Sequence, residues 1–303
     1  MNHATAHTVT LWCAAFSKIE KGIERRLSGT GCTMIQYRVL LQLARPETSQ
    51  ARSSRLSRVL AVRPSVAGLA VEALEARGLV RTQGGSEGGR GALASATQAG
   101  LRLLEGANLP VEAFLSQALS QLGPDEGRLL MEMMHDALAV PGGVFLCVEC
   151  PVARGEALPL PYLLSSIVSF TQVVATTAKN AAGLSLTEYR FLLELLAKRR
   201  GVVKRLRAKD MTALLRVTRS YVTTTAYKLE ERGLLVRDPD PDDARGVLFG
   251  LTAAGERLVG DIGDDVAAAF EGMFGMRPKN PERVMRAGRL LLQGVDAALE
   301  ATS

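Results

Sequence analysis

Basic side chains are concentrated in one short stretch of this sequence. Residues 198–209 contain seven lysines and arginines and no acidic residue. Such a run is often only a solvated surface, but cationic groups also pair with phosphates, which gives affinity and salt dependence without sequence choice. The formal charge of +6 for the whole chain suits a polyanionic partner without proving one. Within this basic run we expect phosphate contacts from Lys204, Arg205 and Arg207.

Hydroxyl groups and one arginine follow the basic run. Near the start of a helix, such donors and acceptors can reach base edges in the major groove of DNA, and Arg219 suits the two-pronged contact to guanine. The alternative is an exposed helix face with a solvated arginine. The candidate base-reading and phosphate-binding residues of this stretch are Thr218, Arg219, Ser220, Thr223, Thr224 and Lys228.

The residues that catalysis requires do not form a recognisable pattern. The three histidines are His3, His7 and His135, and the sequence contains no Ser-His-Asp arrangement, metal-ligand spacing or phosphate-binding loop. We therefore predict that the protein is not an enzyme and has no cofactor or metal.

Four cysteines are present, and two of them form a Cys-x-x-Cys motif at Cys147 and Cys150. A zinc site would need a second such pair or two histidines, which are missing. Free thiols in a reducing compartment are the favoured interpretation. Redox sensing by this pair, or by Cys13 and Cys32, stays open.

The elements that would position these residues occur twice. Residues 73–79 return as residues 228–234, and the Ala-Gly pair ending at Gly100 returns at Gly255, both 155 residues later. A second echo relates residues 37–43 to residues 189–195. With 303 residues, the chain is long enough for two cores. We predict domains at residues 1–140 and 161–303, joined by a connector at 141–160 that is rich in Pro and Gly.

Apolar periodicity predicts a mainly α fold with small β-wings. In each half, two short helices joined by a tight turn make a helix-turn-helix unit, and a β-hairpin follows it. Pro64 suits the first turn of a helix and Gly78 its left-handed end. The first half is expected to have helices at 9–27, 34–43, 53–60, 64–77, 97–121 and 124–139, with strands at 79–82 and 92–95. The second half is expected to have helices at 162–180, 185–197, 209–215, 218–232, 253–274 and 281–299, with a hairpin at 234–251.

The second half resembles the MarR family of bacterial winged-helix transcription regulators. The first half resembles it less well, because Gly88 stands where the second half has Asp243. Its helix face is also plain, with Ala67, Gly68 and Ala70 at the positions of Val222, Thr223 and Thr225. The resemblance of the second half is carried by residues 184–190, 217–223, 229–234, 238–245 and 251–255.

The resemblance implies roles for the two wings. An arginine at Arg245 or Arg90 would reach into the narrow minor groove of DNA, and Asp243 would brace the second wing. Gly88 cannot do the same, so we expect a firmer wing in the second half. Arg63 and Ser65 complete the DNA contacts expected from the first half.

Family members are two-fold dimers, so the resemblance implies two winged helix-turn-helix domains joined through a helical dimerisation-type interface into an intramolecular pseudo-dimer. We expect a monomeric, ligand-responsive repressor that binds double-stranded operator DNA. The resemblance also implies a pocket for a small aromatic or phenolic effector, although these rings are equally compatible with a plain core. The effector candidates are Trp12, Phe16, Tyr37, Arg38, Phe170, Tyr189 and Arg190.

Two alternatives to a ligand-responsive repressor remain. A winged-helix protein–protein adaptor would bind little specific DNA, and a cysteine-based regulator would sense oxidants instead of a small molecule. The composition, with 47% hydrophobic and 22% charged residues, is ordinary for a soluble protein. We find no apolar run that approaches the roughly 18 residues of a membrane span, nor a secretory signal, so we predict a cytoplasmic protein without a membrane partner.

Overall fold

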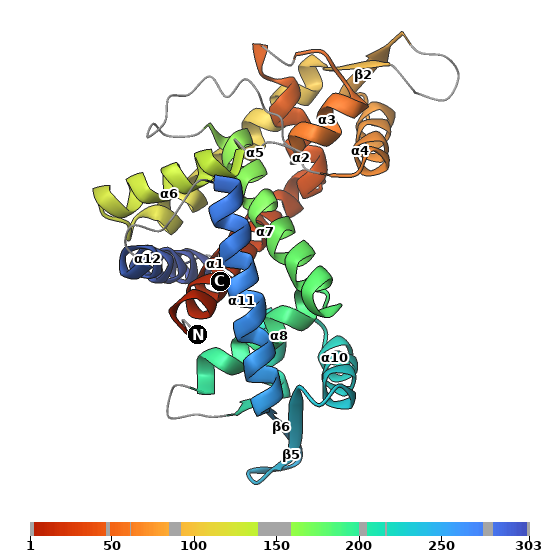
Figure 1. Cartoon of the computed structure of the whole chain (residues 1–303). Coiled ribbons are helices and arrows are strands. Elements are labelled where there is room, and N and C mark those ends of the chain that lie inside the picture. Colours follow the sequence, from red (N-terminus) through yellow and green to blue (C-terminus); the bar gives the residue numbers. More distant parts are fainter. Residues whose placement is uncertain are drawn as a thin grey trace. The chain divides into compact units, whose positions relative to one another are not determined.

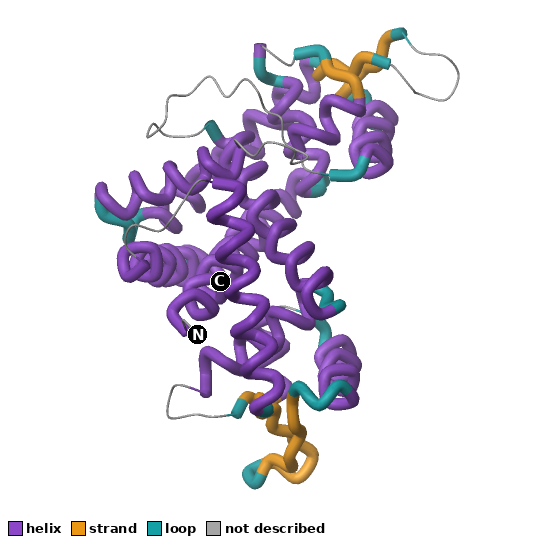
Figure 2. Tube along the Cα trace, in the orientation of Figure 1, coloured by secondary structure: helices purple, strands orange, loops and turns teal. Residues whose placement is uncertain are grey.

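The computed structural model describes residues 3–46, 49–60, 62–84, 92–138, 159–199, 205–215, 217–274 and 281–301. These residues form a mainly helical fold with two small antiparallel sheets (Figures 1 and 2). The mainly α fold predicted from the sequence is therefore confirmed.

The first half contains six helices among its described residues, and most of their bounds lie within two residues of those predicted. The exception is the first helix, which begins six residues earlier than expected. The elements are α1 (His3–Leu27), a 3-10 turn (Ser28–Thr30), α2 (Met34–Leu43), β1 (Ala51–Arg52), α3 (Ser53–Leu60), α4 (Pro64–Ala76), β2 (Val80–Gln83), β3 (Leu93–Ala96), α5 (Gln98–Leu119) and α6 (Pro124–Leu138).

The described residues of the second half follow the same order. The elements are α7 (Leu160–Ala182), α8 (Leu186–Arg199), β4 (Leu206–Arg207), α9 (Ala208–Leu215), α10 (Arg219–Glu231), β5 (Leu235–Asp240), β6 (Asp243–Leu251), α11 (Ala253–Phe274) and α12 (Pro281–Glu300). Each hairpin gains a third strand of two residues, giving the orders β1-β3-β2 and β4-β6-β5. Neither β1 nor β4 was predicted from the sequence, because two residues carry no periodic signal.

The same local contacts close the chain after α4 and after α10. The hydroxyl of Thr97 donates to the carbonyl of Gly78 (2.7 Å), and that of Thr252 donates to the carbonyl of Gly233 (2.8 Å). A β-carbon at Gly255 would lie 2.1 Å from the carbonyl oxygen of Leu234, and Gly100 is equally tight. Each Ala-Gly pair of the sequence therefore marks a helix start that lies directly against the preceding chain.

Contacts between Cα atoms divide the described chain into two compact units whose borders fall inside α1 and α7. One unit, called here the 15–170 unit, also includes residues 286–301. The other, called the 171–272 unit, also includes residues 3–14 and 281–285. The predicted domains 1–140 and 161–303 stay a prediction, and the connector lies outside the described residues up to residue 158.

Inside the 15–170 unit, helices from both halves of the sequence share one core. The hydroxyl of Ser165 on α7 donates to the carbonyl of Val59 at the end of α3 (2.8 Å). The rings of Phe16 and Phe170 meet edge to face, with centroids 5.0 Å apart. On α12, a β-carbon at Gly294 would lie 2.2 Å from the backbone oxygen of Ala118 on α5. The start of α7 and most of α12 thus pack on first-half helices.

Inside the 171–272 unit, the core forms where α8 meets the sheet. Phe191 of α8 and Phe249 of β6 make an edge contact with centroids 5.4 Å apart. Trp12 and Cys13 belong to this unit and are buried, as is Tyr189 of α8. The beginning of α1 is therefore grouped with second-half elements.

Helix α7 is long and apolar enough to cross a bilayer by length and composition alone, which differs from our sequence-based expectation. A core helix of a soluble protein passes the same test. Leu164, Ile167 and Val174 of this helix are buried within the protein.

Candidate nucleic-acid interface

One exposed face of α10 brings together the candidate base-reading residues. The opposite side of the helix is buried through Val222, Ala226 and Leu229, because apolar residues recur at helical spacing. Tyr221 and Tyr227 are exposed beside the candidates. The residues called here the α10 face are Arg219, Ser220, Thr223, Thr224, Tyr227 and Lys228, and all of them are exposed.

The start of α10 is fixed by Thr218. Its backbone is extended, and its hydroxyl accepts a hydrogen bond from the backbone N–H of Tyr221 (3.3 Å), which caps the helix. The same hydroxyl lies 3.0 Å from that of Ser220. Thr218 therefore sets where the helix begins and directs the next residue, Arg219, outward.

The two exposed threonines use their hydroxyl hydrogens inside the helix. Thr223 donates to the carbonyl of Arg219 and Thr224 to the carbonyl of Ser220, both at 3.0 Å. What remains on the outside are methyl groups and acceptor lone pairs, while Arg219 supplies donors. Together these groups match the mixture of donors, acceptors and thymine methyls in a major groove.

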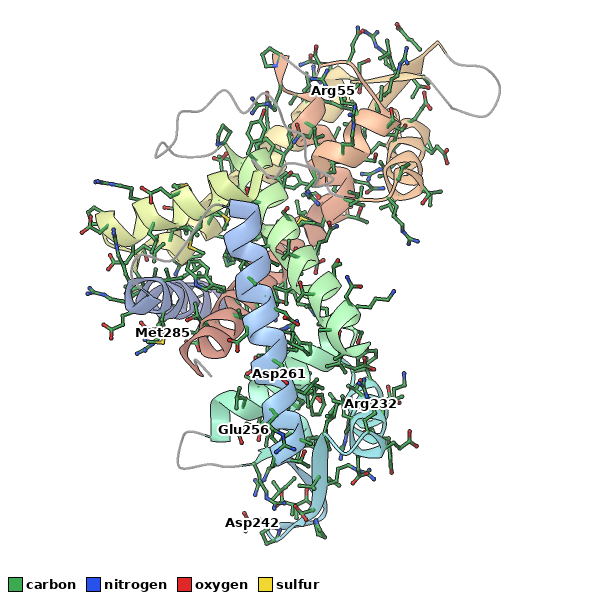
Figure 3. All side chains as sticks on the ribbon, viewed as in Figure 1. Arg55, Arg232, Asp242, Glu256, Asp261 and Met285 are labelled. Carbon is green, nitrogen blue, oxygen red and sulfur yellow. The ribbon has the colours of Figure 1, made fainter. Side chains whose placement is uncertain are left out.

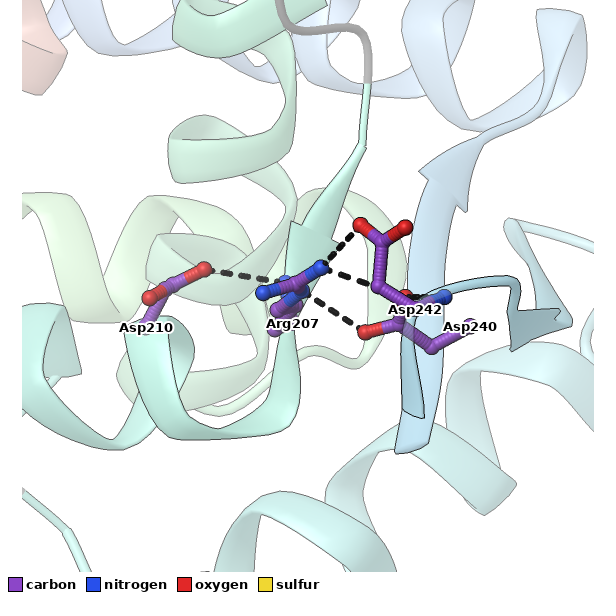
Figure 4. Close-up of polar contacts among 4 residues, drawn as sticks. All are labelled: Arg207, Asp210, Asp240 and Asp242. Atoms are coloured by element: carbon purple, nitrogen blue, oxygen red, sulfur yellow. Dashed lines mark hydrogen bonds and ion pairs between the residues drawn. The ribbon is translucent and has the colours of Figure 1, made fainter. Parts of the chain in front are cut away.

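Beside α10, the hairpin of β5 and β6 forms a wing whose tip carries Asp242 (Figure 3). Figure 4 shows Arg207 of β4 held by two of the wing's carboxylates. Its guanidinium lies 2.7 Å from the carboxylates of both Asp240 and Asp242, and Asp240 is buried. The negative charge of Asp240 raises the pKa of Arg207 above its ordinary value. Arg207 therefore joins the third strand to the wing.

A second arginine of the basic run also pairs with the wing. Arg205 forms an ion pair with Asp238 of β5. Phosphate contacts by Arg205 and Arg207 stay predictions, but both cations already have anionic partners. Sequence reasoning missed Asp238, Asp240 and Asp242. The available signal was a shared spacing of two residues, between Arg205 and Arg207 and between Asp238 and Asp240.

Asp243, the predicted wing brace, is exposed and begins β6, where its backbone pairs with that of Asp240. Gly246 makes this tight tip possible, since a β-carbon there would lie 2.7 Å from that of Asp240. The carboxylates with defined bracing contacts to Arg207 are those of Asp240 and Asp242. The role predicted for Asp243 is not tested by these contacts.

Helix α10 is tied to the wing by Arg237 of β5. The guanidinium carbon of Arg237 lies 3.7 Å from the ring centroid of Tyr227, and its Nη2 lies 2.5 Å from the carboxylate of Glu230. The hydrogen bond to Glu230 raises the pKa of Arg237. In the first half, Glu75 accepts hydrogen bonds from the backbone and hydroxyl of Thr82 at 2.8 and 2.6 Å. Both halves therefore tie this helix to the following strand.

The first-half helix α4 differs from α10 on its outer side. Arg63 precedes it without a side-chain capping bond, and Arg63 and Ser65 are exposed. Ala67 and Ala70 are buried, as are their counterparts Val222 and Thr225. The sequence-based comparison of the two helix faces therefore used the wrong residues. Ala67 and Ala70 belong to the core and not to the outer face of α4.

Several predicted contacts lie outside the described residues, namely Arg90, Lys204, Gly88, Cys147 and Cys150. Arg245 lies in β6, but its side chain is not among those described.

The effector candidates fall into both units. Phe16, Tyr37, Arg38 and Phe170 belong to the 15–170 unit. Trp12 belongs to the 171–272 unit with Tyr189 and Arg190. It is therefore separated from the other first-half candidates, with which the sequence had grouped it. The border inside α1 explains this, because it separates Trp12 from Phe16 along one helix.

Arg38 is a buried cation, with only 4% of its surface exposed. Its Nη2 donates to the carbonyl of Leu60 at the end of α3 (2.6 Å) and to the hydroxyl of Ser165 (3.4 Å). Its Nε has no hydrogen-bond partner among the described residues. Burial lowers the pKa of Arg38 to about 10. The guanidinium thus caps the C-terminal end of α3, and its Nε donor makes no hydrogen bond to a described residue.

The two candidate tyrosines differ in their partners. The hydroxyl of Tyr37 donates to the side-chain oxygen of Asn108 (2.7 Å), whereas the buried hydroxyl of Tyr189 has no partner among the described residues. Burial raises the pKa of both tyrosines. Gly263 lies 155 residues after Asn108 and has no side chain that could accept such a hydrogen bond.

Cys13 and Cys32 are buried free cysteines. Burial raises the pKa of Cys13 to about 12, and it also raises that of Cys32. Burial therefore disfavours the thiolate form of both residues, and the thiolate is the form that reacts with oxidants. Among the described side chains, no cluster of three or more histidines, cysteines or carboxylates could hold a metal ion.

Comparison with known proteins matches residues 182–246 to the MarR family. No curated protein matches the chain. Sco3205, a MarR family transcriptional regulator from Streptomyces coelicolor in complex with DNA, is 21% identical over 42% of this chain and 79% of that chain, with a TM-score of 0.34. CouR from Rhodococcus jostii RHA1, bound to p-coumaroyl-CoA, is 28% identical over 41% and 85% of the two chains, with a TM-score of 0.33. A mutant MarR from E. coli complexed with operator DNA is 17% identical over 42% and 85%, with a TM-score of 0.31. Residues 182–246 therefore contain a MarR family domain.

Proposed function

We propose that this protein is a sequence-specific, double-stranded DNA-binding transcription regulator. The observation that carries the proposal is the α10 face, where Arg219 and the hydroxyl residues share one exposed side of a capped helix. The MarR family match of residues 182–246 includes this helix and most of the wing, which supports the same interpretation. The α10 face enters the major groove, and Arg245 on the wing reaches the minor groove.

Phosphate contacts from both halves of the chain accompany base reading by the α10 face in this proposal. Lys204 and Arg205 of the second half contact the DNA backbone, and Arg63 and Ser65 of the first half do the same. Arg90 on the first wing reaches the minor groove, as Arg245 does on the second. Arg207 acts mainly through the wing that it braces with Asp240.

The single chain works as a MarR-like pseudo-dimer, with one winged helix in each of the domains 1–140 and 161–303, and it is monomeric. Support comes from the matching contacts of Thr97 and Thr252 and from α7 and α12, which pack on first-half helices. A dimer-type interface supplied by one chain leaves no need for a second copy.

The regulator is a cytoplasmic, ligand-responsive repressor whose effector is a small aromatic or phenolic compound. In the 15–170 unit, the buried Arg38, whose Nε has no partner among the described residues, suits the carboxylate of such a compound. Because Arg38 also holds the end of α3, a ligand that drew its guanidinium away would release the turn before α4.

The test is binding of the purified chain to genomic fragments, including the region upstream of its own gene, at several salt concentrations. We expect selective binding to few fragments, with affinity that falls steeply as salt rises. Arg219→Ala should lower the affinity for the selected fragment by about tenfold or more and relax selectivity. Arg257→Ala removes the same charge from an exposed position of α11 and should keep the selectivity.

Two outcomes would overturn the proposal. Weak binding that does not distinguish between fragments would favour the protein–protein adaptor. Equal effects of Arg219→Ala and Arg257→Ala on affinity would show that α10 does not read bases.

A further inference from the structure

The outer faces of α4 and α10 are equivalent in position but not in chemistry. Residues 155 positions apart correspond, because the contacts that follow the two helices repeat at that spacing. The α10 face has two cations, three hydroxyl residues and a tyrosine. Its counterparts on α4, in the same order, are Pro64, Ser65, Gly68, Leu69, Glu72 and Ala73.

The α4 counterparts offer little to a major groove. Ser65 is the one neutral hydrogen-bonding side chain among them, and Leu69 is 64% exposed. Reading a base pair takes donors and acceptors aimed at base edges, which apolar side chains cannot supply. The helix has no basic residue, and its exposed Glu72 would be repelled by phosphates. Helix α4 is therefore unsuited to base reading.

Basic residues nevertheless border α4. Arg52 of β1, Arg58 of α3 and Arg63 directly before α4 all have exposed side chains. These three cations lie on the elements that lead into the helix and not on its outer face. Such an arrangement suits contacts to the DNA backbone, which hold a protein on the duplex without selecting a sequence.

We infer that the chain reads one half-site of its operator. The second half reads bases through α10, and the first half binds the neighbouring backbone without sequence choice. The inference rests on the proposed DNA-binding function and adds the form of the operator, which is a single specific half-site beside a stretch of DNA whose sequence is free.

The experiment uses the full chain and a duplex derived from the selected genomic fragment, with fluorescence anisotropy as the readout. Successive blocks of base pairs are replaced by unrelated sequence, and the affinity is measured for each duplex. Replacement should lower the affinity by about tenfold or more within one continuous half of the protected region. Replacement in the other half should change it less than threefold.

Two sets of variants assign each half to its helix. Ser65→Ala and Leu69→Ala should leave the sequence preference unchanged. Arg52→Ala, Arg58→Ala and Arg63→Ala combined should weaken binding to every duplex by the same factor and lower the salt slope by about three, close to one per lost phosphate contact. All five positions are at least partly exposed and outside the core, so these variants should fold.

The outcomes separate the inference from the proposed function. Comparable losses in two separate halves, or a changed preference in Ser65→Ala or Leu69→Ala, would overturn the single half-site while keeping the regulator. An unchanged salt slope in the triple variant would overturn the backbone role of the first half. Affinity that no replacement changes would overturn both the inference and the proposed function.

Discussion

The guanidinium of Arg207 lies 2.7 Å from the buried carboxylate of Asp240, and the two residues come from β4 and β5, the two outer strands of one three-stranded sheet. Arg207 lies on β4, which directly precedes α9, and its side chain contacts the wing. The pair therefore links the start of the helix-turn-helix to the wing, and the wing's position depends on an arginine that sequence alone suggested for DNA phosphates.

Asp240→Asn tests whether Asp240 affects DNA binding by bracing Arg207 or only by its negative charge. Removing a negative charge near DNA would by itself strengthen binding, because phosphates repel carboxylates. Loss of the brace should do the opposite and weaken binding on the order of tenfold, since the wing would no longer be held. Anisotropy with the selected fragment measures the sign. Asp261→Asn, at an exposed position of α11, is the control for charge alone. Tighter binding by Asp240→Asn would contradict the brace.

The contact of Arg237 with Tyr227 should be measurable as a coupling energy. Tyr227→Ala and Arg237→Ala, singly and together, form a double-mutant cycle for thermal unfolding. An exposed cation–aromatic pair contributes about 0.5–1 kcal/mol, so the cycle should report a favourable coupling of that size. Tyr227→Phe retains the aromatic ring and should retain most of the coupling energy. Additive effects of the two single changes would mean that the ring does not stabilise the arginine.

Gly255→Ala should destabilise the second half strongly. The added methyl would meet the carbonyl of Leu234 at 2.1 Å, and backbone cannot move aside as a flexible side chain can. We expect a loss of about 1–3 kcal/mol in the free energy of unfolding. Gly106→Ala is the matched control, because nothing lies within 4 Å of its added methyl and alanine favours a helix. Equal stability of the two variants would show that the close approach at Gly255 is wrong.

Thiol reactivity tests the burial of Cys13. Its folded pKa of about 12 exceeds the ordinary value of 9.0, so only the unfolded chain loses this proton between these values. The contribution of Cys13 to stability is therefore complete below about pH 9 and falls as the pH rises toward 12. In a Cys147→Ser, Cys150→Ser background, the native protein at pH 8 should react slowly with a thiol reagent and rapidly after denaturation. Rapid native reaction at Cys13 would contradict its burial and favour the oxidant-sensing alternative.

Much of the fold could be predicted because its helices are amphipathic and their ends carry signals. Pro64 and Thr218 stand at the helix starts, and Gly78 and Gly233 adopt the left-handed conformation at the ends (φ 68° and 67°). The two-residue strands β1 and β4 have no comparable signal, since they are defined only by pairing with β3 and β6.

The site was predicted less completely than the fold. The α10 face followed from helical spacing, but Arg207 required knowledge of β4, because only the third strand brings it to Asp240. The alanines of α4 were misjudged because correspondence between positions does not reveal which of them are buried. Likewise, Trp12 and Phe16 are close in sequence but belong to different units, which no local pattern could indicate.

The central claim, that α10 reads bases, is tested most directly by protection of guanine N7 from dimethyl sulfate on the selected fragment. This atom lies in the major groove, where an arginine that pairs with guanine covers it. The account predicts at least one guanine that the wild-type protein protects and that Arg219→Ala leaves reactive, at concentrations where both proteins occupy the fragment. Protection that is absent, or that is unchanged in Arg219→Ala, would contradict it.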